Sequence, residues 1–172
     1  MRVRQPPARS NQPTMPARGP LSARDANILD RLRRQSGTFA DSLEQALKDL
    51  NDHTRLSYIG PAGEVREVMR ATVQLLAPED EVRKQEWFKG VQQGGKVNST
   101  QSERIRYAVQ QRGGSKDQAK GVDQLIDELV GQIGRQTYSA GSSAFHAGTL
   151  QEKVRKLTGW VFAVLDEVLP EL

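Results

Sequence analysis

Apolar residues recur at steps of three and four along most of the chain after residue 20, which is the spacing of helices with one buried face. Such stripes predict helices from about Ser22 to Gly37, through Phe39–Leu50, from about Pro61 to Ala77, after Thr100, over about 116–137 and after Thr149. No alternating run of β-branched residues exceeds four residues, so strands are not expected. The pattern predicts an all-α fold, a helical bundle of six or seven helices.

Capping residues mark where these helices are expected to begin. Ser22 with Asp25 is typical of a helix start, and Thr100-Gln-Ser-Glu103 and Thr149-Leu-Gln-Glu152 both match a capping box. Pro78 is expected to open a further element, because the acidic residues 79–81 suit the positive end of a helix. The stretch Gly90–Ser99 is rich in Gly, Gln and Asn and is expected to be a loop.

The first twenty residues differ from the rest in composition. They contain four arginines, no acidic residue and five of the eight prolines, so we expect a disordered basic tail over 1–20 and one all-α domain over 21–172. The net charge of +4 belongs to this tail, because the remaining residues carry 21 basic and 21 acidic side chains. The tail is either a solvated extension or an arm that becomes ordered on a partner or on phosphates.

Several classes of chemistry have no support in the sequence. There is no cysteine, which excludes disulfides, thiolate nucleophiles and Cys-type zinc sites. The two histidines, His53 and His146, form no metal-binding pair, and no phosphate-binding glycine motif is present, so neither a metal nor a cofactor is expected. The chain has neither the apolar run of a membrane span nor that of a secretory signal, and we expect a cytoplasmic protein without membrane contact.

Reactive side chains gather in one stretch, residues 135–146, between two predicted helices. Arg135 can hold phosphate oxygens through its guanidinium, and His146 can transfer a proton near neutral pH. These two groups suffice for RNA cleavage in which a 2′-hydroxyl attacks the adjacent phosphorus, and Tyr138 and Ser142 can position the phosphate or orient the imidazole. Alternatively, the hydroxyls are turn and capping residues and His146 is a buried structural histidine.

Arginines on two predicted helices form a second candidate set. Arg66 and Arg70 lie four residues apart on one helix face, and Arg104 and Arg106 belong to the helix that Thr100 opens. They are candidates for a phosphate-binding surface or for contact with an acidic partner. The alternative is an ordinary helix surface with ion pairs.

Three stretches resemble a known family. They are Arg55–Val68 with its continuation Leu75–Val82, Thr100–Tyr107, and Arg135–His146, and together they are similar to the predicted pPIWI-associating nucleases of prokaryotic defence loci. The arginine and histidine before a last amphipathic helix also resemble the HEPN superfamily. That resemblance implies a HEPN-like helical bundle, often dimeric, with metal-independent ribonuclease activity.

The resemblance implies an antiphage defence or toxin protein that binds RNA and cleaves it without a metal. Its partners would be RNA, a second copy of the chain or a larger defence protein. Arg135 and His146 are eleven positions apart in the sequence. That spacing is roughly 16 Å along a continuous helix, so both groups reach one phosphate only if the helix breaks near Gly141 or a dimer mate supplies one of them. The alternative is a non-catalytic helical adaptor or dimerisation subunit of a larger defence complex.

Overall fold

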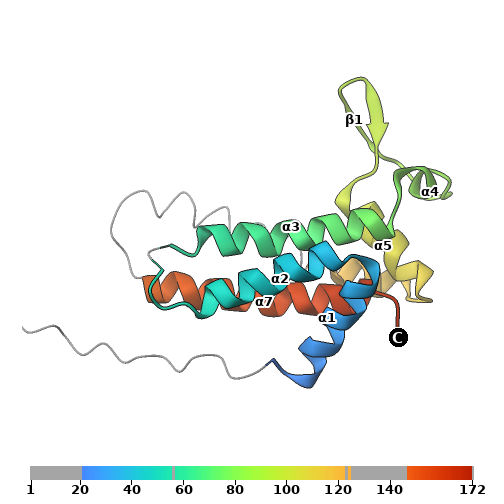
Figure 1. Cartoon of the computed structure of the whole chain (residues 1–172). Coiled ribbons are helices and arrows are strands. Elements are labelled where there is room, and N and C mark those ends of the chain that lie inside the picture. Colours follow the sequence, from blue (N-terminus) through green and yellow to red (C-terminus); the bar gives the residue numbers. More distant parts are fainter. Residues whose placement is uncertain (1–20, 56, 123, 125–146, 172) are drawn as a thin grey trace, which may run out of the picture.

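The computed structural model describes residues 21–55, 57–122, 124 and 147–171. Three long helices lie side by side along the molecule: α2 (Gly37–Asn51), α3 (Ile59–Leu76) and α7 (Ala147–Val168) (Figure 1). Helix α1 (Ala23–Gln35) crosses them at an angle and contacts α2 and α7. Helix α5 (Gln101–Gln111) packs on α3 and α7 at one end of the body, and residues 116–122 are also helical. The predicted all-α bundle is confirmed.

A single apolar cluster joins these helices. Each contributes the stripe that the sequence predicts, and the completely buried members include Ile28, Leu32, Leu43, Val65, Val73, Ile105, Val161 and Leu165. Leu76 is only half-buried, at the end of the α3 stripe. The hydroxyls of Thr72 and Thr158 lie within the core and donate to the carbonyls of Val68 and Val154, one turn back in their own helices.

Most predicted helix starts are confirmed by their capping bonds. The Ser22 hydroxyl accepts from the backbone N–H of Asp25 at 3.1 Å. Thr100 and Glu103 form a complete capping box, in which each side chain accepts from the backbone N–H of the other residue. Helix α4 (Glu79–Arg83) follows Pro78 as expected. The capping box at Thr149 is wrong, because α7 begins at Ala147 and Thr149 lies inside it.

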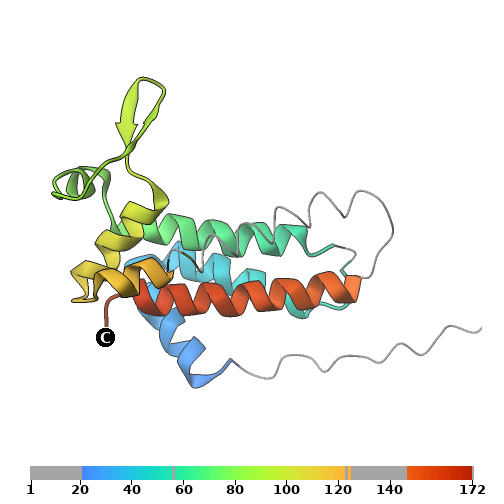
Figure 2. The same cartoon turned by 180° about the vertical axis from the view of Figure 1, so that it is seen from behind.

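The stretch expected to be a loop is instead a β-hairpin. Strand β1 (Val91–Gln93) pairs antiparallel with β2 (Lys96–Asn98), and Val91 lies opposite Asn98. Gly94 and Gly95 form the two-residue turn, with φ of 59° and 77°. Glycine adopts this conformation without steric cost. Figures 1 and 2 both show this hairpin projecting beyond the helical body, beside α4.

Candidate functional site

The four predicted catalytic residues, Arg135, Tyr138, Ser142 and His146, lie outside the described residues. The described chain resumes at Ala147, the first residue of α7. One turn later, the Gln151 side chain is buried and donates to the Leu50 carbonyl at 2.6 Å. The beginning of α7 is therefore held against the end of α2.

The second histidine, His53, follows α2 at this same end of the body. Its side chain is exposed, and its neighbour Asp52 forms a turn in which the carboxylate accepts from the backbone N–H and the hydroxyl of Thr54. These hydrogen bonds lower the pKa of Asp52, and the charges of Arg55 and His53 lower it further. The turn is held by local bonds, so His53 is an exposed residue that can be changed without opening the core.

Arg66 and Arg70 lie on α3, as predicted. Arg70 grips the Glu67 carboxylate with two guanidinium nitrogens, its Nε at 2.8 Å. This charge-assisted contact lowers the pKa of Glu67. Arg66 is exposed one turn earlier, and Glu67 and Glu64 line a groove of about 380 Å³ between α2 and α3. An anion approaching Arg66 and Arg70 would thus meet two carboxylates as well.

Arg104 joins three elements. Its guanidinium donates to the Ala77 carbonyl after α3 at 2.9 Å and to the Glu79 carboxylate of α4 at 2.5 Å. Glu79 also accepts from Arg83 and from the backbone N–H and hydroxyl of Ser99. Burial alone raises the pKa of Glu79, but these hydrogen bonds and the charge of Arg104 outweigh it and bring the pKa to about 2.

Arg106 makes a different contact, although it lies only two residues further along α5. Its guanidinium carbon stacks 4.2 Å from the centre of the Trp87 ring, which is a cation–π contact. Its Nε is buried and has no hydrogen-bond partner within the described part of the chain. Sequence periodicity places Arg104 and Arg106 on one helix but gives no sign of the 84–90 segment that supplies the ring.

The four predicted arginines therefore occupy two separate helices and contact different partners. Arg70 and Arg104 are already paired with carboxylates, and Arg106 is paired with an aromatic ring. An incoming phosphate would have to compete with these contacts at three of the four positions. Their role in nucleic-acid binding stays a prediction.

Sequence reasoning missed a cluster of arginines at the end of α7. Arg31 is only 3% exposed and donates to the carbonyls of Asp166, Leu169 and Pro170 and to the Asp166 carboxylate. Arg24 binds the same carboxylate from the exposed side. Burial alone raises the pKa of Asp166, but these two arginines lower it. The signal in the sequence is a cation inside the apolar stripe of α1, among Ile28, Leu29 and Leu32.

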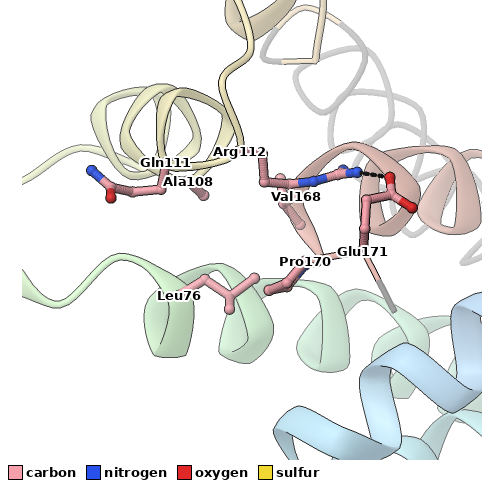
Figure 3. A pocket seen from close by; sticks show the side chains of 7 residues that line it. All are labelled: Leu76, Ala108, Gln111, Arg112, Val168, Pro170 and Glu171. Atoms are coloured by element: carbon pink, nitrogen blue, oxygen red, sulfur yellow. Dashed lines mark hydrogen bonds and ion pairs between the residues drawn. The ribbon is translucent and has the colours of Figure 1, made fainter.

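A pocket of about 290 Å³ lies beside this cluster (Figure 3). It is lined by Leu76, Ala108, Gln111, Arg112, Val168, Pro170 and Glu171. Arg112 donates to the Glu171 carboxylate and to the Asp166 carbonyl, so its guanidinium is occupied. Among these lining side chains there is no hydroxyl and no imidazole, and the Glu171 carboxylate is paired with Arg112, so the pocket offers a packing site.

Arg155 on α7 is another residue that periodicity did not single out. Two of its guanidinium nitrogens, Nε and one Nη, are buried and have no hydrogen-bond partner among the described residues. Arg155 lies one turn after Gln151 and three turns before Asp166, so helical spacing places it on the side of α7 that faces α1 and α2. Arg155 as a whole is only partly buried, and buried polar nitrogens without an acceptor carry a cost in free energy.

Two broader properties of the described part of the chain bear on function. Within these ranges, no three His, Asp or Glu side chains come together as ligands for a metal ion. None of the described helices has the length and apolar character needed to cross a bilayer.

The fold and its contacts define an all-α helical protein with a projecting hairpin. Comparison with known families then places it: the model of the predicted pPIWI-associating nucleases matches residues 33–166. The chain belongs to this family, which confirms the resemblance of its three motifs. No curated protein and no solved structure matches the chain.

Proposed function

We propose that this protein is the nuclease component of a prokaryotic defence system, that it acts with a pPIWI-type partner, and that it cleaves RNA without a metal. The observation that carries the proposal is family membership over residues 33–166, a span that contains all of 135–146. That stretch unites an arginine, a tyrosine, several hydroxyls and a histidine directly before α7.

The proposed chemistry divides the work between two groups. His146 takes the proton from the 2′-hydroxyl as that oxygen attacks phosphorus, and it returns a proton to the leaving 5′-oxygen. Arg135 stabilises the negative charge that develops on the phosphate oxygens. Tyr138 and Ser142 orient the imidazole or the phosphate. This is the HEPN-like mechanism, and a homodimer is one way to bring the two groups together across their eleven-residue spacing.

Labelled RNA and DNA, each incubated with the purified full chain in EDTA and in Mg²⁺, test this function. We expect RNA cleavage that EDTA does not reduce and that His146→Ala lowers about 100-fold or more, since general acid–base catalysis contributes about 10²–10⁴-fold. His53→Ala is the matched control, because it removes the only other histidine from an exposed turn and should cleave like the unchanged protein.

The outcomes separate the alternatives. Loss of cleavage in EDTA would contradict the metal-free mechanism and indicate a metal-dependent nuclease. Equal losses in the His146 and His53 variants would contradict the assignment of His146.

A non-catalytic adaptor is the second candidate, and one observation favours it. Three of the four arginines predicted to bind phosphate already have partners within the chain. If no nucleic acid is cleaved under any condition, and His146→Ala markedly lowers the melting temperature, the adaptor accounts for the protein better.

A further inference from the structure

The β-hairpin projects from the end of the helical body (Figures 1 and 2). Two carboxylates secure its base. Glu103 accepts from the backbone N–H groups of Lys89 and Gly90 at 2.8 and 2.9 Å, and Glu79 accepts from that of Ser99 at 2.8 Å. Both ends of the hairpin are therefore fixed to α4 and α5.

Gly90 shows how closely this base is packed. A side chain at this position would place its Cβ 2.4 Å from Val97 and 2.7 Å from the Phe88 ring. Gly90 also has a φ of 65°. Such a positive φ favours glycine. Phe88 and Val97 thus close one face of the hairpin at its base.

The opposite face is open. Alternation along the strands places Val91, Gln93, Lys96 and Asn98 together on this face, and the pairing of Gln93 with Lys96 sets an amide beside an ammonium group. Residues 91–97 are all exposed, whereas Asn98 is half-buried and its side-chain oxygen accepts from Arg83 at 3.3 Å. The tip is a pair of glycines without side chains, so another backbone can approach it closely.

The charge on this arm has one sign. No acidic residue occurs between Trp87 and Ser102, whereas Lys89 and Lys96 are both exposed. The two carboxylates at the base are already occupied by the hairpin's own backbone and by Arg83 and Arg104. The arm therefore presents positive charge and amide groups to its surroundings.

From these observations we infer that the hairpin is a nucleic-acid-binding arm. Lys89 and Lys96 contact phosphates, and the Gln93 amide meets base edges or sugar hydroxyls. A two-stranded ribbon is narrow enough to enter the major groove of B-DNA, which is about 12 Å wide. The inference rests on the proposed function only in that both have nucleic acid as the ligand. Binding by the arm does not require that the protein cleave that nucleic acid.

A protein partner fits these features less well. The two exposed valines, Val91 and Val97, lie on opposite faces and form no continuous apolar patch. Strand addition along β2 is hindered, because Arg83 already donates to the Val97 carbonyl at 2.5 Å.

Salt-dependent binding of the full chain tests the arm directly. The experiment compares the His146→Ala protein with the same protein that also carries Lys89→Gln and Lys96→Gln. The affinity of each for single-stranded RNA, duplex RNA and duplex DNA is measured between about 50 and 200 mM salt. Loss of two phosphate contacts should reduce the slope of log K against log salt by about 1.8 for duplex DNA and by about 1.4 for a single strand. The nucleic acid whose slope falls by the amount expected for two lost contacts is the one that the arm contacts.

Lys116→Gln with Lys120→Gln is the matched control. Both lysines are exposed on residues 116–122, a segment that Gln118 joins to Glu167 of α7, away from the hairpin (Figure 2). The control removes the same charge and should leave the slope unchanged. Three results would overturn the inference. The hairpin variant and the unchanged protein could show equal slopes, the two lysine pairs could reduce the slope equally, or the unchanged protein could bind no nucleic acid. Cleavage measured separately with a functional His146 distinguishes failure of the arm from failure of the nuclease proposal.

Discussion

Glu79 joins α4, the hairpin and α5 through one carboxylate, and its charge contributes to stability in a defined range of pH. Its pKa is lowered from 4.5 to about 2 in the folded chain, so the contribution is full above pH 4.5 and is lost as the pH falls towards 2. The Glu79 side chain is 26% exposed, so solvent screens part of this contribution. Glu79→Gln should therefore lower the free energy of unfolding at pH 7 by on the order of 1–3 kcal/mol.

Urea unfolding at several pH values measures this effect. The difference between Glu79→Gln and the unchanged protein should shrink between about pH 4.5 and pH 2. Glu81→Gln is the control on the same helix, since Glu81 pairs with the exposed Lys84 and its loss should change stability far less than the loss of Glu79. A Glu79 effect that is equal at pH 7 and pH 3 would mean that the carboxylate charge is not its source.

For single residues, the sequence predicts the helix on which a side chain lies better than it predicts the residues that the side chain contacts. The flanking of Glu67 by Arg66 and Arg70 follows from helical spacing, and the Glu67–Arg70 contact is local. The partners of Arg104 and Arg106 lie 25 and 19 positions away along the chain. No periodicity encodes such contacts, because they depend on how α4 and the 84–90 segment pack onto α5.

The end of α7 is held by arginine side chains from other elements. The last carbonyls of a helix have no partner within it, and Arg31 donates to three carbonyls in this region. Removal of Arg31 leaves these groups and Asp166 without their buried donor. Arg31→Ala should therefore lower the free energy of unfolding by about 3–5 kcal/mol, measured by urea unfolding at pH 7.

Arg24→Ala separates this effect from simple loss of charge. Arg24 binds the same Asp166 carboxylate, but its side chain is 64% exposed. Its removal should therefore cost less than about 1 kcal/mol, as for other exposed ion pairs. Equal effects of the two variants would show that the carbonyl contacts of Arg31 contribute little.

The local sequence predicts the first residue of a helix correctly where a capping residue is present, as at Ser22 and Thr100. The hairpin escapes prediction because its strands are three residues long and lack a β-branched alternation, although the Gly94-Gly95 pair is a known hairpin signal. The Thr149 motif predicts a start that α7 does not use, because the helix begins earlier at Ala147. Short motifs thus indicate that a helix or turn lies nearby more reliably than they fix its first residue.

Across the whole molecule, α5 connects the bundle to the hairpin. Helix α5 buries Ile105, Ala108 and Val109 in the common core. Arg104 and Arg106 flank this buried face on its two sides and contact Glu79 and Trp87, respectively. Val82 of α4 is buried but lies outside the common apolar cluster. The junction therefore depends largely on polar and cation–π contacts, and its cooperativity with the bundle can be tested.

Two tryptophans report on these two parts separately. Trp87 lies at the junction, and Trp160 packs against the core from α7. Because α5 belongs to both parts, we expect the fluorescence of Trp87→Phe and Trp160→Phe proteins to give urea transitions with the same midpoint and slope, as for one cooperative unit. Circular dichroism of each variant supplies the control for any change in overall stability that the substitution causes. If the Trp87 signal changes at a lower urea concentration than helicity in the same protein, the α4–hairpin part opens before the bundle, and residues 21–172 do not unfold as one domain.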